Sequence, residues 1–304
     1  MNAAAFDWTG FEVRYIDVNG VRIRARVDAG APNGRPVLVL VHGYPQSHVM
    51  WRRVAQALRP DFFIVMPDLR GYGESTCPPD QPDHAQASKR AMAADVTAVM
   101  DALGVQHFFL CGHDRGARVA HRLVLDHPGR VARLCLIDIA PTLDMYEQTD
   151  MAFARAYYHW FFLIQPAPLP EMMIGPVARD YLLANLGGWG SGGLNHIETD
   201  ARAEYERCFC RPETIHAVCE DYRASAGIDL THDRESREHE ARIDCDTLVL
   251  WGERGVIHRL FDPLALWQAQ CAGRVVGEPM PAGHFIPEEL PDANAAALKG
   301  FMHG

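Results

Sequence analysis

The segment Gly112-His113-Asp114-Arg115-Gly116 carries the strongest chemical signal in the 304-residue sequence. It follows the apolar run Phe108 to Cys111 and precedes a helical pattern that opens at Ala117. Small residues at positions 112 and 116 permit the tight strand-to-helix turn of a nucleophile elbow, which lifts the central side chain above a sheet. That side chain is Asp rather than Ser. A carboxylate is a poor acyl nucleophile, but it can displace a leaving group from saturated carbon and form an enzyme ester. The alternative is an Asp that only caps the following helix.

Two further segments supply partners for such a nucleophile. Gly283-His284-Phe285 follows the last predicted strand, where the chain order nucleophile, acid, histidine places a catalytic base. His42-Gly43-Tyr44-Pro45 follows the apolar run Val37 to Val41, where one amide of an oxyanion hole is expected. We therefore predict that the backbone N–H groups of Tyr44 and Arg115 face the carbonyl oxygen of the ester.

The acid that orients His284 has two candidates. Asp138 follows the apolar run Leu134 to Ile137, at the carboxyl end of a predicted strand. Glu253 is the alternative, because the segment after Leu248 to Trp251 offers no Asp. An acid is needed to hold the histidine tautomer and to stabilise the imidazolium that forms. We predict Asp138 for this role.

Arg115 and Arg118 stand three residues apart at the start of the predicted helix, so they project from neighbouring faces of its first turn. Two guanidinium groups beside Asp114 can bind a substrate carboxylate through paired hydrogen bonds. They would offset its repulsion from the nucleophile. The alternative is that one arginine makes a nearly neutral surface ion pair.

The order of elements predicts an α/β fold with a mostly parallel central sheet flanked by helices. Alternating residues around Asn19-Gly20 indicate a β-hairpin. Continuous apolar runs, typical of buried parallel strands, then recur at Val37 to Val41, Phe62 to Met66, Phe108 to Cys111, Leu134 to Ile137 and Leu248 to Trp251, with a last strand near Val275. Helices are predicted at Met50 to Leu58, Lys89 to Leu103, Ala117 to Asp126 and Pro263 to Gln270.

The strand rhythm stops between Ile139 and about Arg242, where the sequence is aromatic-rich and helical. We interpret residues 139–242 as an inserted helical cap domain on a core formed by residues 1–138 and 243–304. The Gly187 to Gly193 stretch within it could be a mobile flap, although a tolerant surface loop is the simpler interpretation.

Composition excludes several classes of protein. The net charge of −10 disfavours nucleic acid and anionic lipid as partners. Residues 1–10 lack a signal-peptide pattern, and the apolar stretch from Tyr157 to Pro170 is too short to span a membrane, so a cytoplasmic protein is expected. The eight cysteines show no disulfide framework. Cys208, Cys210, His216 and Cys219 fit no common zinc spacing, so we predict no metal site.

Several segments together resemble the fluoroacetate and haloacetate dehalogenases of the α/β-hydrolase superfamily. The matching segments cover most of the chain and are His42 to Gln46, Gly112 to Arg118, Asp138 to Thr142, Tyr158 to Trp160, Gln165 to Pro170, Cys219 to Ala224, Trp251-Gly252 and Gly283 to Phe285.

The resemblance implies Asp114 as nucleophile, His284 as the base for water and Asp138 as its acid. It implies that Arg115 and Arg118 hold the substrate carboxylate, that His159, Trp160 and Tyr222 bind the halide, and that Trp189 roofs the same pocket. It further implies a small halocarboxylate substrate, no cofactor, and a homodimer as a common assembly. Without the resemblance, His159 and Trp160 would pass as ordinary cap aromatics and Tyr222 as core.

The expected reaction converts haloacetate and water to glycolate and halide through an Asp114 ester. An epoxide hydrolase would use the same nucleophile, but its neutral substrate gives no use for two arginines. A haloalkane dehalogenase typically has Trp after the nucleophile, where this chain has Arg115. A non-catalytic ligand-binding protein of the same fold need not retain nucleophile, acid and base together.

Overall fold

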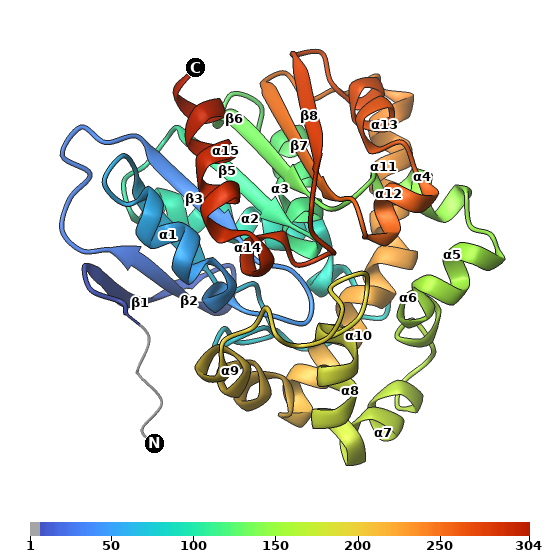
Figure 1. Cartoon of the computed structure of the whole chain (residues 1–304). Coiled ribbons are helices and arrows are strands. Elements are labelled where there is room, and N and C mark those ends of the chain that lie inside the picture. Colours follow the sequence, from blue (N-terminus) through green and yellow to red (C-terminus); the bar gives the residue numbers. More distant parts are fainter. Residues whose placement is uncertain (1–6) are drawn as a thin grey trace.

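A single sheet organises the computed structural model, which describes residues 7–304. Its eight strands follow the order β1-β2-β4-β3-β5-β6-β7-β8 (Figure 1). The strands are β1 (Phe11–Val18), β2 (Val21–Asp28), β3 (Val37–Val41), β4 (Phe63–Pro67), β5 (Phe108–His113), β6 (Val131–Ile137), β7 (Asp246–Gly252) and β8 (Val275–Met280). β2 pairs antiparallel with both β1 and β4, and every other pair is parallel. The predicted α/β class is confirmed.

The hairpin and the buried strands follow from local sequence. Val18 pairs with Val21 across the Asn19-Gly20 turn, where both residues have positive φ (49° and 76°), a conformation that Asn and Gly adopt most readily. All five residues of β3 are buried, as expected for a central parallel strand covered on both faces.

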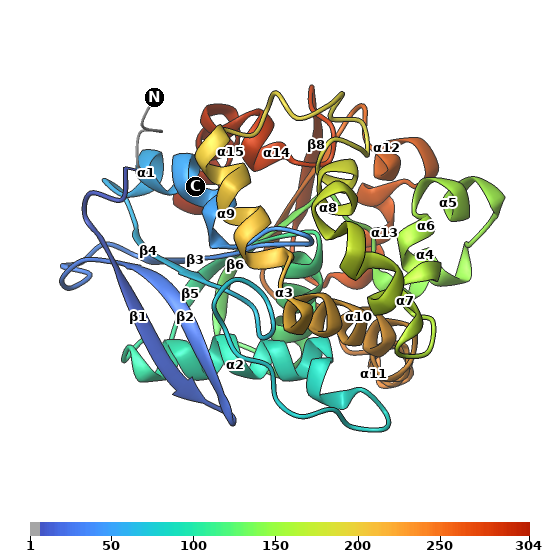
Figure 2. The ribbon, with the colours of Figure 1, turned by 90° about the horizontal axis from the view of Figure 1, so that it is seen from below.

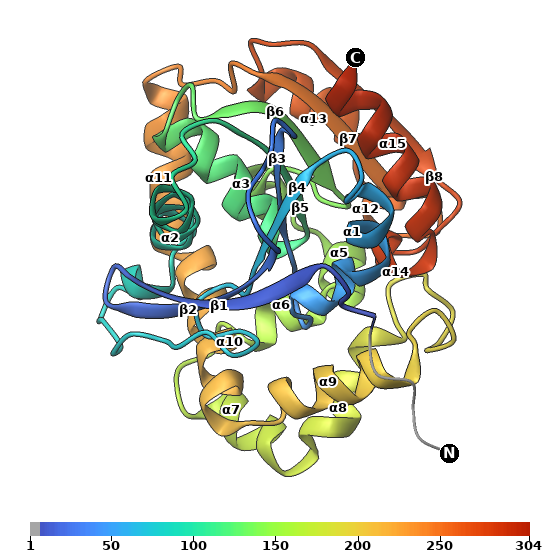
Figure 3. The same cartoon turned by 90° about the vertical axis from the view of Figure 1, so that its left-hand side faces the viewer.

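Helices cover both faces of the sheet. Helices α2 and α3 pack against each other on one face, and α1 and α15 pack together on the other (Figure 3). The helices outside the long insertion are α1 (Arg52–Leu58), α2 (Lys89–Ala102), α3 (Arg115–Asp126), α12 (Val256–Leu260), α13 (Pro263–Gln270), α14 (Ile286–Glu289) and α15 (Pro291–His303), with short 3-10 turns at His48–Trp51 and Ala85–Ala87.

Between β6 and β7 the described chain is helical and contains no strand. In Figure 2 these inserted helices lie partly in front of the sheet and partly to its right. They are α4 (Thr142–Glu147), α5 (Met151–Ala156), α6 (Tyr158–Phe162), α7 (Leu169–Ile174), α8 (Ala178–Leu186), α9 (Thr199–Phe209), α10 (Pro212–Ala226) and α11 (Ile228–Glu238), with a 3-10 turn at Gly175–Val177. None of the helices in residues 7–304 is both long and apolar enough to cross a bilayer. Residues 1–6, part of the segment judged for a signal peptide, lie outside the described residues.

Candidate active site

Asp114 occupies the sharp turn between β5 and α3, with φ 49° and ψ −117°. The two flanking glycines make this turn possible. A Cβ on Gly112 would lie 2.4 Å from the carbonyl oxygen of Gly116, and one on Gly116 would lie 2.3 Å from that of Val41. Side chains cannot be accommodated at these distances, so the strained backbone at Asp114 is held by close packing on both sides.

His284 lies between two carboxylates. Its Nδ1 donates to Asp138 Oδ2 at 2.5 Å, and its Nε2 lies 3.9 Å from Asp114 Oδ2. Asp138 Oδ1 also accepts a hydrogen bond of 2.9 Å from the Gly252 amide, which orients the acid. Glu253, the alternative acid, is exposed. The geometry thus favours Asp138 as the partner of His284.

The charge states of these groups follow from burial and from each other. Burial is the largest single influence on His284 and would lower its pKa, but the hydrogen bond to Asp138 and the attraction to Asp138 and Asp114 together raise the pKa above the ordinary value. Burial by itself would raise the pKa of Asp114. Attraction to His284, Arg118 and other nearby groups together outweighs burial, so the pKa of Asp114 falls below the ordinary value. Asp114 is therefore ionised at neutral pH, as a nucleophile must be.

The amide of Tyr44 donates to Asp114 Oδ1 at 2.9 Å. Gly43 permits this approach, since a Cβ there would lie 2.5 Å from Asp114 Cβ. One carboxylate oxygen is thus fixed on a backbone donor, and the other faces His284. The predicted contribution of the Arg115 amide stays a prediction.

The two arginines are buried, so the surface ion pair considered as an alternative is wrong for both. Arg115 makes a buried ion pair with Asp221, which the sequence did not predict. The guanidinium of Arg118 instead donates to Thr142 Oγ1 at 2.9 Å and to the Ala140 carbonyl at 3.2 Å. Within residues 7–304, no carboxylate oxygen lies within 4.0 Å of its guanidinium nitrogens.

Aromatic residues from the inserted helices meet the core at this site. The His159 ring stacks on Tyr44 at 5.7 Å between centroids and lies edge-on to Tyr222, also at 5.7 Å. Trp189 lies 4.7 Å from the His159 ring and 5.2 Å from the His284 ring. Trp160 instead contacts Arg118, whose guanidinium carbon lies 4.7 Å from the centroid of its ring. Trp189 therefore lies beside His284 and His159, Tyr222 lies beside His159, and Trp160 lies beside Arg118.

Several buried polar atoms here have no hydrogen-bond partner within the described protein. They are Arg115 Nη1, Arg118 Nε, His159 Nδ1 and Tyr222 Oη. Burial lowers the pKa of His159 to about 3 and raises that of Tyr222 well above its ordinary value, so both rings are neutral. An unmet buried hydrogen bond costs about 1–3 kcal/mol. Such atoms gathered beside Asp114 indicate a site for a small ligand that accepts hydrogen bonds.

Comparison with known proteins agrees with this geometry. Residues 36–290 match the family model described as alpha/beta hydrolase fold. The chain belongs to the α/β-hydrolase fold family. It is 41% identical over 293 residues to a fluoroacetate dehalogenase of Burkholderia sp, covering 96% of this chain and 94% of the relative. The resemblance inferred from the sequence motifs is thereby confirmed.

Two other proteins are also similar to this α/β hydrolase over most of its length. A soluble epoxide hydrolase of Corynebacterium sp. (strain C12) is 32% identical over 279 residues, covering 90% of this chain and 91% of the relative. A solved structure from Nostoc sp PCC 7120, named only as a candidate alpha/beta hydrolase, is 50% identical with a TM-score of 0.92, covering 97% of this chain and 98% of its own. The similar proteins thus include both a dehalogenase and an epoxide hydrolase.

Sequence reasoning missed the residues that brace this α/β hydrolase's site. Asp221, the partner of Arg115, precedes Tyr222 in the segment Cys219 to Ala224. That segment contributed to the family resemblance but gave no indication of a role for Asp221. Glu289 accepts hydrogen bonds from the Gly283 amide at 2.7 Å and from Ser191 Oγ at 2.6 Å. It thereby ties the Gly187 to Gly193 stretch to the loop of His284. No local pattern announces these contacts, because each joins distant segments.

The cysteines near His216 do not converge on an ion site. All eight cysteines are free, and His216 instead contacts Asp80 at 2.9 Å and Glu171 at 3.0 Å. Asp80, His216 and Glu220 have ligand atoms within 4.8 Å of one another. Arg223 already binds Glu220 and Glu171 there, so part of the local negative charge is balanced by the protein itself.

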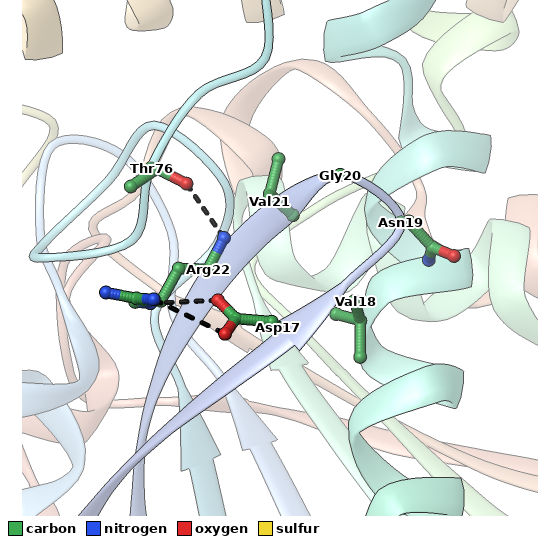
Figure 4. A pocket seen from close by; sticks show the side chains of 7 residues that line it. All are labelled: Asp17, Val18, Asn19, Gly20, Val21, Arg22 and Thr76. Atoms are coloured by element: carbon green, nitrogen blue, oxygen red, sulfur yellow. Dashed lines mark hydrogen bonds and ion pairs between the residues drawn. The ribbon is translucent and has the colours of Figure 1, made fainter.

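A separate surface pocket of about 420 Å³ lies at the tip of the β1–β2 hairpin (Figure 4). It contains an exposed ion pair between Asp17 and Arg22, and the Arg22 amide donates to Thr76 Oγ1. None of the triad residues lines it. This pocket is therefore separate from the site at Asp114.

Proposed function

We propose that this protein is a hydrolytic dehalogenase that converts a haloacetate, such as fluoroacetate or chloroacetate, and water to glycolate and halide. The observation that carries the proposal is an ionised carboxylate on the elbow, facing buried donors that lack partners. The 41% identity to a relative named fluoroacetate dehalogenase supports the same substrate class.

In the first step Asp114 attacks the carbon that bears the halogen. The new bond joins the carboxylate oxygen to that carbon, and the carbon–halogen bond breaks with its electron pair on the departing halide. His159, Trp160 and Tyr222 donate hydrogen bonds to the halide, which replaces part of the hydration it would have in water. Arg115 and Arg118 hold the substrate carboxylate. The product of this step is a glycolyl ester of Asp114.

In the second step His284 takes a proton from water, and the resulting hydroxide attacks the ester carbonyl carbon of Asp114. The Tyr44 and Arg115 amides stabilise the oxyanion. The bond between the carbonyl carbon and the glycolyl oxygen then breaks, and glycolate takes the proton from His284. The 3.9 Å between His284 Nε2 and Asp114 Oδ2 exceeds a hydrogen bond, which leaves the imidazole free to act on water.

An epoxide hydrolase is the main alternative, since a relative with that name is 32% identical. An epoxide is neutral, however, and provides nothing to balance the buried cation of Arg118. A haloalkane dehalogenase meets the same objection. A non-catalytic binding protein would have no need for the hydrogen bond between Asp138 and His284.

We further propose that residues 139–242 act as a cap domain on a core formed by residues 1–138 and 243–304. The helical insertion between β6 and β7 supports this division. A homodimer and a cytoplasmic location remain predictions from the sequence, and size-exclusion chromatography tests the first.

The test measures fluoride and chloride release from fluoroacetate and chloroacetate beside diol formation from a panel of epoxides. We expect halide release, and its loss in Asp114→Ala, whereas Asp101→Ala at the exposed end of α2 should keep the parental rate. A single turnover in heavy-oxygen water should label the Asp114 side chain. Parental halide release by Asp114→Ala, or label found only in product, would overturn the ester mechanism.

A further inference from the structure

Arg115 and Arg118 differ in how the protein balances their charge. Arg115 Nε donates to Asp221 Oδ2 at 3.0 Å, and its Nη2 donates to Asp221 Oδ1 at 2.5 Å. Nη2 also contacts the Asp221 carbonyl at 3.0 Å and Ser225 Oγ at 2.5 Å. Only Nη1 is left without a partner. Arg118 has no such acid beside it.

Asp221 is itself held by residues from other elements. The Tyr72 hydroxyl donates to its Oδ2 at 2.7 Å, and Lys89 Nζ donates to its Oδ1. Lys89 Nζ also lies 3.8 Å from Asp229 Oδ2. Asp221 and Asp229 belong to the inserted helices α10 and α11, whereas Tyr72 and Lys89 belong to the core. All four residues are buried. Their contacts hold Asp221 between the core and the inserted helices.

The charges within this group cancel, because two cations, Arg115 and Lys89, face two carboxylates, Asp221 and Asp229. Arg118 is therefore the arginine whose charge this group does not balance, and Arg115 contributes a directed donor. Without Asp221, the unbalanced guanidinium of Arg115 would be drawn toward the ionised Asp114. An ion pair there would make the Asp114 carboxylate less nucleophilic and would compete with its attack on the substrate.

We propose that Asp221, braced by Lys89 and Tyr72, is a positioning residue that aims Arg115 Nη1 at the substrate carboxylate and keeps Arg115 away from Asp114. The proposal rests on the dehalogenase function proposed above. It assigns Asp221 an effect on the rate of carbon–halogen cleavage more than on the affinity for the carboxylate. A lower cleavage rate with unchanged affinity for the carboxylate distinguishes a positioning role from a general loss of site structure.

The experiment compares Asp221→Asn with Asp229→Asn, which removes the same charge from the same group at a residue that reaches Arg115 only indirectly, for example through Ser225. Fluoride release in a single turnover is measured with saturating fluoroacetate, and acetate serves as a competitive inhibitor without a leaving group. For Asp221→Asn we expect release to slow by roughly 10- to 100-fold, the usual effect of a misplaced catalytic contact. The inhibition constant of acetate should stay within about threefold or become tighter, since Arg118 and the unbalanced Arg115 still attract the anion.

Asp229→Asn should keep both values within about threefold of the parent. Tyr72→Phe removes one hydrogen-bond donor to Asp221 at constant charge. It should slow fluoride release by about three- to tenfold and leave the inhibition constant of acetate unchanged. This variant tests the proposal if Asp221→Asn does not fold. Parental release rates in Asp221→Asn and Tyr72→Phe, or equal losses in rate and acetate affinity, would overturn the role of Asp221. A parent protein that releases no halide, or that acetate does not inhibit, overturns the proposed function instead.

Discussion

The catalytic triad on the core side and the aromatic residues on the inserted side of the site differ in how their polar groups are satisfied. On the core side, Asp114 accepts from the Tyr44 amide, and Asp138 accepts from the Gly252 amide and from His284. On the inserted side, His159 Nδ1 and Tyr222 Oη are buried without partners in the described protein.

This difference separates two kinds of preorganisation. The triad on the core side is held by protein hydrogen bonds, so nucleophile, base and acid keep their geometry before any ligand arrives. Arg115 Nη1 and Arg118 Nε, which α3 contributes from the core, still lack partners, as the aromatic residues of the inserted side do. The inserted side retains hydrogen-bonding capacity that the folded chain leaves unmet, at a cost in stability. We infer that a ligand offsets this cost. The comparison predicts that variants of the two sides fail in different ways.

Replacing His284 should have the largest effect, because it removes the base from the core side. His284→Asn should release about one equivalent of halide per site and then stop, with steady-state turnover lowered about 10³- to 10⁴-fold. Mass spectrometry should find a glycolyl group on the peptide that contains Asp114. The exposed His239, changed to Asn, serves as the control. A variant that accumulates no ester, or releases no first equivalent, would contradict the assignment of His284 to the second step.

Tyr222→Phe tests the inserted side and should lower turnover of fluoroacetate about 100-fold, the effect of losing one preorganised donor to developing charge. The effect on chloroacetate should be smaller, since chloride is less strongly hydrated than fluoride. Denaturant unfolding should show stability unchanged or raised, because the lost hydroxyl had no partner.

Tyr205→Phe is the matched control for Tyr222→Phe. The Tyr205 hydroxyl is buried but bonded to Glu288, so its loss should cost about 1–3 kcal/mol of stability and leave the rate unchanged. If Tyr222→Phe retains the parental rate with fluoroacetate, the contrast between the two sides is wrong.

The core side could be predicted from the sequence because its residues follow local patterns. Asp138 comes directly after an apolar run, Asp114 follows another after Gly112 and His113, and β6 and β5 place both at one edge of the sheet. His284 follows the last strand by the same logic. The prediction of β3 as Val37–Val41 matches residue for residue, since a fully buried central strand leaves an unbroken apolar run.

The inserted side could not be predicted in this way. The roles of His159, Trp160 and Tyr222 came only from the resemblance, because helical aromatics have the same appearance whether they pack or bind. The ion pair of Arg115 with Asp221 joins residues 106 positions apart. Such contacts depend on how the inserted helices dock, which no local periodicity encodes.

The smallest effect is expected at the seam between the two sides. His216 on α10 contacts Asp80 of the core and Glu171 on α7, with Glu220 and Arg223 nearby. Burial lowers its pKa, but the hydrogen bonds to Asp80 and Glu171 outweigh burial and raise the pKa above the ordinary value of 6.5. Protonation is therefore favoured in the folded state. The stabilisation is complete below pH 6.5 and is lost as the pH rises through the folded pKa.

His216→Asn should accordingly cost stability at about pH 6 and little at about pH 9. Because the side chain is about one-third exposed (36%), the loss should be at most about 0.5 kcal/mol. Urea unfolding of both proteins at the two pH values measures it. His107→Asn, at an exposed histidine bonded to the Gly129 carbonyl, is the control. A loss for His216→Asn that is equal at both pH values would mean that packing, and not a charged clasp, joins the inserted helices to the core at this point.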